Sequence, residues 1–209
     1  MDVNKHLESA RAFERQGKYA EACSEYEKAA EADPDCAEAW MNWGGALVMS
    51  GMHNKAPYKF KMFMKLIKKA NIEPPDTGIV TKEMLVCAFE SLRTFAIVPL
   101  DIVSYFMWGI ALCMYGRYKE AEEKFHRAVE LMLGYADAYY TWGLALAARG
   151  MHEDAIKKLQ KAVEINPEYA EAYYVWGLIL EKLGRDEEAA EKYRQASEVD
   201  PECMDFMKE

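Results

Sequence analysis

The sequence of 209 residues predicts an all-α protein, a right-handed α-solenoid of stacked helix pairs with about eleven helices. The first observation is a near-repetition. YYTWGLALAARG at residues 139–150 returns as YYVWGLILEKLG at residues 173–184, an offset of 34 residues. The second observation is a glycine that recurs in the same register along the chain. The third is that apolar residues follow helical spacing on both sides of this glycine.

Five frames of 34 residues fit the chain, and each position in a frame is given a place number from 1 to 34. The frames begin at Val3, Ala37, Ile102, Ala136 and Ala170. A small residue stands at place 8, glycine at place 15, alanine at place 20 and a large apolar or aromatic residue at place 24. The turn glycines at place 15 are Gly17, Gly51, Gly116, Gly150 and Gly184.

Each frame is expected to form two amphipathic helices, A and B, because apolar residues run at helical spacing over places 4–11 and again over places 20–28. The glycine at place 15 ends helix A in the left-handed conformation that a tight turn needs. Small residues at places 8, 20 and 27 let the two backbones approach, while large side chains at places 4, 7 and 24 fill the gap to the neighbouring frame. Because no pair can bury its apolar faces alone, the frames must stack.

Residues 70–101 interrupt the frames. The stretch NIEPPDTG is a breaker-rich loop, after which Thr81 is expected to cap a helix that runs to about Ile97. This helix is apolar around most of its circumference and therefore needs cover on most sides. Three of its side chains are expected to pack against frames two and three: Phe89, Leu92 and Phe95.

The run FAIVPLDIVSYFMWGIALCMY, at residues 95–115, holds one charge in 21 residues, which is long enough to raise a membrane-spanning alternative. Two features argue against that alternative. Pro99 and Asp101 are expected to act as a helix break and a helix N-cap, and the second half of the run follows the frame register. We therefore assign the run to the solenoid.

The five-fold recurrence of a small residue, a turn glycine and an alanine closely resembles the tetratricopeptide repeat family, whose helix pairs share this length. The resemblance covers about four-fifths of the chain and implies an α-solenoid of the family type. Four tryptophans at place 7 depart from the family pattern, which usually has leucine there: Trp43, Trp108, Trp142 and Trp176. We expect these tryptophans to pack between helices rather than to contact a ligand.

The frames divide the chain into four parts: repeats one and two at 3–69, the loop and inserted helix at 70–101, repeats three to five at 102–203, and a short tail at 204–209. The net charge of −9 gives no global electrostatic support for binding DNA or RNA. Five cysteines without a CxxC pair favour a reducing compartment, and the polar start MDVNKHLESARAF lacks the apolar core of a secretory signal. The chain is therefore expected to be cytoplasmic.

No constellation of residues predicts catalysis, so we expect no catalytic residue, no cofactor and no metal. His53 and His152 occupy the same place in two frames, just past the turn glycine, and this periodicity explains them without a metal. The cysteines are expected to be buried and unreactive. The glycines lack the spacing of a phosphate-binding loop.

The resemblance places the inner, concave wall of the solenoid on helix A, at places 2, 5, 9, 12 and 13. These residues are mostly polar in frame one, whereas in the middle of the chain they are apolar, aromatic and rich in methionine. Such a wall suits an apolar or amphipathic segment of another protein. The expected partner-binding residues are Met41, Met49, Phe106, Ile110, Met114, Tyr140, Leu144, Tyr174 and Leu178.

An equally weighted interpretation is that part of this wall packs against the inserted helix, because a large uncovered apolar patch is unusual. The ligand would then lie mainly along six of the nine residues: Phe106, Ile110, Tyr140, Leu144, Tyr174 and Leu178. Replacing Tyr140 and Tyr174 with alanine is expected to leave the fold intact and to weaken partner binding. Phe89→Asp is expected to destabilise the fold.

One subclass of the family clamps the C-terminal carboxylate of heat-shock chaperones with lysine, asparagine and arginine. Asn42 matches the asparagine of that clamp, but the other clamp places do not supply its cations. They hold Leu7, Arg11, Val103 and Met107. Chaperone-tail binding is therefore not expected.

Helix B of frame two, at residues 54–69, carries Lys61, Lys65 and Lys68 on one face. We expect this face to be solvated; the alternative is contact with an acidic partner or an anionic lipid surface. The function that the sequence favours is a non-catalytic scaffold that binds another protein or peptide. The second hypothesis is a peripheral-membrane assembly or secretion-chaperone-like factor that uses this helix and the apolar region 81–115. The sequence leaves the partner and the oligomeric state open.

Overall fold

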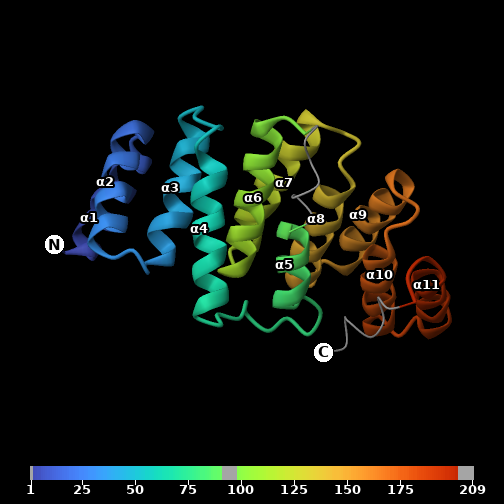
Figure 1. Cartoon of the computed structure of the whole chain (residues 1–209). Coiled ribbons are helices and arrows are strands. Elements are labelled where there is room, and N and C mark those ends of the chain that lie inside the picture. Colours follow the sequence, from blue (N-terminus) through green and yellow to red (C-terminus); the bar gives the residue numbers. More distant parts are fainter. Residues whose placement is uncertain (1, 91–97, 202–209) are drawn as a thin grey trace.

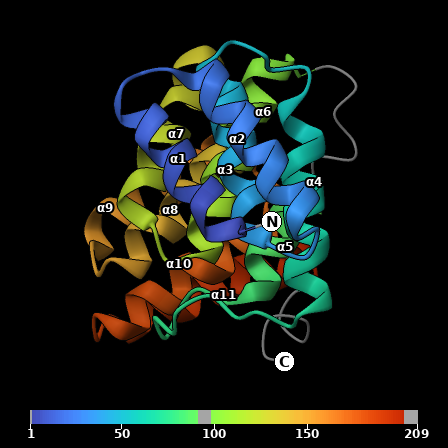
Figure 2. The same cartoon turned by 90° about the vertical axis from the view of Figure 1, so that its left-hand side faces the viewer.

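The fold is an α-solenoid of helix pairs, as predicted. The computed structural model describes residues 2–90 and 98–201, and these form eleven helices without a strand. Apart from α5, which lies beyond α6, the helices follow one another along the molecule from α1 near the N-terminus to α11 (Figure 1), and α1 and α2 lie in front when the molecule is viewed from that end (Figure 2). The bounds are α1 Val3–Arg15, α2 Tyr19–Ala32, α3 Ala37–Met49, α4 Ala56–Lys69, α5 Lys82–Glu90, α6 Leu100–Met114, α7 Tyr118–Leu131, α8 Ala136–Ala148, α9 His152–Ile165, α10 Ala170–Lys182 and α11 Asp186–Val199.

The turn glycines end each helix A in the expected conformation. At Gly150 the backbone has a φ of +74°, which a residue with a side chain rarely adopts. The Gly150 N–H donates to the Ala147 carbonyl at 2.9 Å, and the Met151 N–H donates to the Leu146 carbonyl at 2.9 Å. These two bonds form a Schellman motif, which satisfies carbonyls at the end of α8. The glycines at place 15 in the other four frames also have positive φ.

The small residue at place 8 lets the side chain at place 24 approach helix A. A Cβ built on Gly109 would lie 2.4 Å from Cε1 of Phe125, which is fully buried. The same relation holds in three other frames, between Gly44 and Phe60, between Gly143 and Leu159, and between Gly177 and Tyr193. The close approach predicted for place 8 is therefore confirmed, whereas these contacts place the residue at place 24 against helix A of its own frame rather than in the gap to the neighbouring frame.

Each tryptophan at place 7 is covered by a lysine at place 23 of the same frame, a partner that the sequence analysis missed. The four ammonium groups lie over the indole rings. The distance from the lysine Nζ to the ring centroid is 3.1 Å for Lys59 on Trp43, 4.4 Å for Lys124 on Trp108, 3.6 Å for Lys158 on Trp142 and 4.0 Å for Lys192 on Trp176. Frame one has Ser9 and Glu25 at these places, so both members of the cation–π pair are absent together. The tryptophans therefore join helix A to helix B, as the expected packing role requires.

The inserted segment lies against frames three to five. Thr81 caps α5 as predicted, because its Oγ1 accepts a hydrogen bond from the Met84 N–H at 3.3 Å. Helix α5 packs against α6 and α8, the A helices of frames three and four. The expectation of packing on frames two and three was therefore half wrong. The extension of the helix to residue 97, including Leu92 and Phe95, falls outside the described residues.

The loop before α5 crosses the turns of the later frames. The Lys82 ammonium is buried and donates to Asn71 at 2.6 Å, which ties the start of the loop to α5. The hydroxyl of Tyr118, on α7, donates to the Pro75 carbonyl at 3.5 Å. The Lys182 ammonium, at the end of α10, donates to the Thr77 carbonyl at 3.1 Å. The loop therefore connects frame two to frames three and five near their turns between helices A and B.

Helix α6 begins at Leu100, directly after Pro99, so the predicted break is confirmed. Asp101 lies in the first turn of α6 rather than at the N-cap, which corrects the predicted cap. In the part of the chain that the structure describes, no helix is long and apolar enough to cross a membrane. The four-part division of the chain stays a prediction.

We expect Gly109→Ala to lower the free energy of unfolding by about 1–3 kcal/mol, because the new methyl group overlaps the buried ring of Phe125. Gly134→Ala is the matched control, since a Cβ at Gly134 meets no atom within 4 Å. Urea unfolding followed by circular dichroism measures both. Equal effects of the two substitutions would show that the place 8 contact does not limit packing.

We expect Trp142→Ala and Trp176→Ala each to lower the free energy of unfolding by about 3 kcal/mol, the lower end for a large aromatic side chain, because both rings are only half-buried. Lys158→Met keeps the aliphatic stem over Trp142 and removes only the cation, so its cost is expected to stay under about 1 kcal/mol. The same unfolding measurement applies. A tryptophan variant that keeps its stability but loses a partner would contradict the packing role.

Candidate functional site

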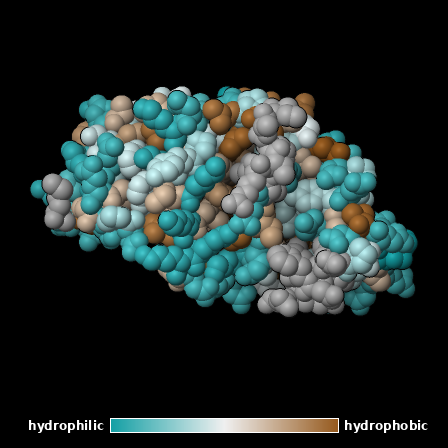
Figure 3. Space-filling view, in the orientation of Figure 1, coloured by the Kyte–Doolittle hydropathy of each residue, from teal (hydrophilic) through white to brown (hydrophobic). Residues whose placement is uncertain are grey.

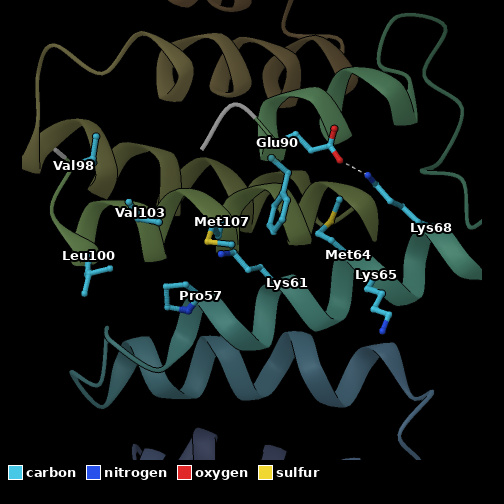
Figure 4. A pocket seen from close by; sticks show the side chains of 11 residues that line it. Pro57, Lys61, Met64, Lys65, Lys68, Glu90, Val98, Leu100, Val103 and Met107 are labelled. Carbon is cyan, nitrogen blue, oxygen red and sulfur yellow. Dashed lines mark hydrogen bonds and ion pairs between the residues drawn. The ribbon is translucent and has the colours of Figure 1, made fainter. Parts of the chain in front are cut away.

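A pocket of about 530 Å³ lies between α4, α5 and α6. Apolar side chains from α4 and α6 face its interior, and Met64 and Met107 both point into the space between these helices (Figure 4). Its volume and its apolar lining fall within the range of ligand-binding pockets. The lining residues are Pro57, Lys61, Met64, Lys65, Lys68, Phe89, Glu90, Val98, Leu100, Val103 and Met107.

The pocket exists because the insertion changes the joint between frames two and three. At the other joints each helix B packs on the next helix A: α2 on α3, α7 on α8, and α9 on α10. Compared with these three contacts, the contact of α4 with α6 is less extensive. Helix α6 packs on α3 as well. Part of the surface of α4 therefore lacks the cover that α2, α7 and α9 have.

The floor of the pocket is apolar and partly open. Met64 and Met107 are buried, whereas Phe89 and Val103 are half-buried and Leu100 is 53% exposed. In Figure 3 hydrophobic surface near the upper end of α6 borders hydrophilic surface over α4. Methionine side chains adapt to differently shaped apolar partners. The floor is therefore suited to holding apolar side chains of a ligand.

Three lysines of α4 form the rim of the pocket: Lys61, Lys65 and Lys68, all exposed. The ammonium of Lys68 pairs with the carboxylate of Glu90 on α5 (Figure 4). Within residues 2–90 and 98–201, neither Lys61 nor Lys65 forms an ion pair. The predicted solvated face of helix 54–69 is confirmed, and the same face borders an apolar pocket, which its sequence alone did not indicate.

Seven of the nine residues predicted to form an open inner wall are instead buried within the chain: Met41, Phe106, Ile110, Met114, Tyr140, Leu144 and Tyr174. Their assignment to an accessible surface is wrong. At place 5 the ring of Phe106 lies 5.0 Å from that of Tyr135, between centroids, and Tyr174 lies 5.6 Å from Tyr193. Place 5 therefore faces helix B and the start of the next frame.

Met49 is exposed and Leu178 is half-buried, so only these two of the nine stay predictions as partner contacts. Tyr140 is buried and its ring lies 5.0 Å from that of Tyr169. The expectation that alanine at Tyr140 and Tyr174 leaves the fold intact is therefore wrong as well, because both rings belong to the core.

Helix α5 supplies part of the cover over the A helices. Its residues Met84, Leu85 and Ala88 are buried, and the helix packs on α6 and α8, which carry Ile110 and Leu144. The interpretation in which the inserted helix fills part of the inner wall is thus correct, with frames three and four in place of frames two and three. The protein covers this part of the wall with its own chain.

The inner wall of frame one is polar, as expected. The Arg11 guanidinium pairs with the carboxylate of Glu38, and the Tyr26 hydroxyl donates to Glu14 at 2.9 Å. Burial raises the pKa of the Glu14 carboxyl against the opposing effect of that hydrogen bond. The Asn42 amide donates to Glu38 at 3.5 Å, so the one residue that matches the chaperone clamp already has an acidic neighbour.

Burial raises the pKa of each described cysteine thiol. It raises the pKa of Cys23 to about 11 and also raises that of Cys113, which is fully buried. Cys203 falls outside the described residues. The Nδ1 atoms of His53 and His152 are buried without a hydrogen-bond partner. Among the described residues no group of three or more histidine, cysteine, aspartate or glutamate side chains is arranged to hold a metal ion; the expectation of no catalysis, cofactor or metal stays a prediction.

We expect the triple substitution of Lys61, Lys65 and Lys68 by glutamate to lower the free energy of unfolding by less than about 1 kcal/mol, because exposed charges contribute little to stability. Far-UV circular dichroism and a thermal melt measure this. A loss of helical signal at room temperature would contradict the exposed placement of the three side chains.

Comparison with known proteins places this architecture in a family. Tetratricopeptide repeat models match residues 7–61 and 170–203, and a TPR repeat model matches residues 143–184; together these matches cover more than half of the chain. No curated protein matches the sequence significantly.

Several solved structures are similar to the chain. One is a crystal structure of MamA, 25% identical over 98% of both chains with a TM-score of 0.49. A second is MamA of Desulfovibrio magneticus RS-1, 21% identical over 95% of both chains with a TM-score of 0.48. A third is YrrB, described as a TPR protein with an unusual peptide-binding site, 21% identical over 99% of this chain and 91% of that chain with a TM-score of 0.50. From the repeat matches and the stacked helix pairs, the chain belongs to the tetratricopeptide repeat family.

Proposed function

We propose that this protein is a non-catalytic scaffold that binds an apolar or amphipathic segment of another protein. The observation that carries the proposal is the pocket between α4, α5 and α6, which combines an apolar floor with an opening to solvent. Apolar surface that stays accessible in a folded chain is favourable to bury against a partner. The partner's segment binds at this joint between frames two and three.

Two further observations support a protein as the ligand. The chain is built of tetratricopeptide repeats, and one structural neighbour with this fold is described as having a peptide-binding site. The inner wall of frames three and four is already covered by α5, which leaves the joint beside α4 as the place where apolar floor residues remain accessible. Because the described cysteines are all free, we propose the same reducing, cytoplasmic setting that the sequence favours.

A second candidate function is a peripheral-membrane assembly or secretion-chaperone-like role. The observation in its favour is that three exposed lysines and the exposed side chain of Leu100 border one pocket. Cations beside an apolar group are also what an anionic lipid surface attracts. Sedimentation with anionic vesicles separates the two candidates, because only the membrane role requires salt-sensitive binding to vesicles without a protein partner.

We expect Leu100→Asp to reduce capture of the native partner at least tenfold, because it places a charge at the entrance of the apolar pocket. Leu133→Asp is the matched control, since Leu133 is 72% exposed and does not line the pocket. Both tagged variants and the unmodified chain are cross-linked in extracts of the native source, and the captured proteins are quantified.

Leu100→Asp is expected to fold normally, since Leu100 is exposed and an acidic residue suits the first turn of α6. Circular dichroism checks this. If Leu100→Asp and Leu133→Asp capture the same proteins in the same amounts, binding at this pocket is ruled out.

A further inference from the structure

We infer that the segment bound in this pocket is an acidic amphipathic helix, which lies along α4 with carboxylates facing Lys61, Lys65 and Lys68 and apolar side chains inserted between Met64 and Met107. This inference rests on the proposed function and adds the chemistry of the partner. The pocket alone fits any apolar ligand. The charge on its rim selects among such ligands.

The rim lysines follow the axis of α4 at the spacing of a helix. Lys61, Lys65 and Lys68 stand four and three residues apart, so they share one face and extend over about 10 Å at the helical rise of 1.5 Å per residue. Acidic residues at the same spacing on a second helix match this row when the two helices lie side by side. Met64 lines the pocket from the same helix, so a ligand helix meets charge and apolar surface together.

The charge at this position is reversed only in frame two. Lys65 occupies place 29, where the other four frames carry glutamate: Glu31, Glu130, Glu164 and Glu198. Four of five frames thus keep an acid on this face of helix B, in a chain whose net charge is −9. Among the four described B helices that are followed by another frame, the basic substitution falls on α4, whose contact with the next helix A, α6, is the least extensive. A cationic rim and an open joint therefore occur at the same point.

The protein itself shows the kind of group that this rim accepts. Glu90 lies at the end of α5, a helix beside α4, and its carboxylate pairs with Lys68. A ligand helix with the same chemistry supplies carboxylates to Lys61 and Lys65, which have no ion pair in the described residues. Exposed ion pairs add little affinity one by one, so burial of the apolar side chains supplies most of the binding energy and the charges supply selectivity.

The shape of the site favours a helix over a lipid surface. Phe89, from α5, and Met107, from α6, line the pocket together with Met64 from α4, so three helices contribute side chains to it. Its volume of about 530 Å³ suits a few side chains of an amphipathic helix, the mode in which apolar anchors enter a groove. A bilayer contacts a protruding apolar face, whereas Met64 and Met107 of this pocket are buried.

The test uses two fluorescein-labelled peptides of 16 residues that form amphipathic helices with the same leucine face. One carries glutamate beside the leucines at positions i, i+4 and i+7, and the other carries lysine at those positions. Binding to the full chain is measured by fluorescence anisotropy at low and high salt. We expect the unmodified protein to bind the glutamate peptide at least tenfold more tightly than the lysine peptide, with the preference weakening at high salt.

Lys61→Glu with Lys65→Glu is expected to abolish or reverse this preference. The matched control is Lys157→Glu with Lys161→Glu, which makes the same charge change at the same spacing on α9, outside the pocket. The control is expected to keep the preference, and circular dichroism verifies that both variants are folded. Recovery of tight binding when the rim variant meets the lysine peptide shows direct charge pairing.

Three results would overturn the inference. The rim variant keeps the glutamate preference; or the control loses the preference to the same extent; or the unmodified protein ignores both peptides but sediments with phosphatidylserine vesicles through Lys61 and Lys65. A failure of this inference can be distinguished from a failure of the proposed function. If Leu100→Asp loses the native partner while the rim variant retains it, protein binding at the pocket stands and the acidic chemistry of the partner does not.

Discussion

The solenoid depends on a small residue at place 8. In four frames a glycine there leaves room for the large residue at place 24, and a Cβ at Gly109 would overlap the ring of Phe125 at 2.4 Å. This contact holds the helices of one pair close enough for a common core. The outer faces of each pair then remain apolar, and only the next pair can cover them. Stacking follows from packing within the pair.

The insertion matters because it changes how neighbouring pairs stack at the joint between frames two and three. Loop and helix add a segment between α4 and α6, and α5 then covers α6 and α8 instead of extending the row of pairs. The inner wall of frames three and four becomes part of the core, while α4 loses part of its usual cover. The insertion thus covers part of the expected ligand surface and opens a pocket beside it.

The frames also differ in which polar and charged side chains pair with one another. These differences separate residues that stabilise their own frame from residues that are available to a partner. The tryptophan at place 7 and the lysine at place 23 occur together in frames two to five and are both absent from frame one. This agreement suits a pair that stabilises the frame from within. At place 29, Lys65 replaces the glutamate of the other four frames, and it forms no ion pair within its own frame. This pattern favours a contact with a partner outside the frame.

The sequence by itself determined the elements that short-range physics controls. The period, the helix pairs, the left-handed turn glycines, the Thr81 cap and the break at Pro99 each depend on residues within one or two turns of each other.

Only the tertiary structure decided which apolar face covers which. Phe106 and Tyr140 have the pattern of an exposed wall in a regular solenoid, yet neighbouring frames and their own helix B bury them. The pocket joins Met64, Phe89 and Met107 from three consecutive helices, and their packing against one another depends on how the insertion folds back. Burial depends on long-range packing, and a single insertion redirects that packing without changing the periodic pattern from which the helices were predicted.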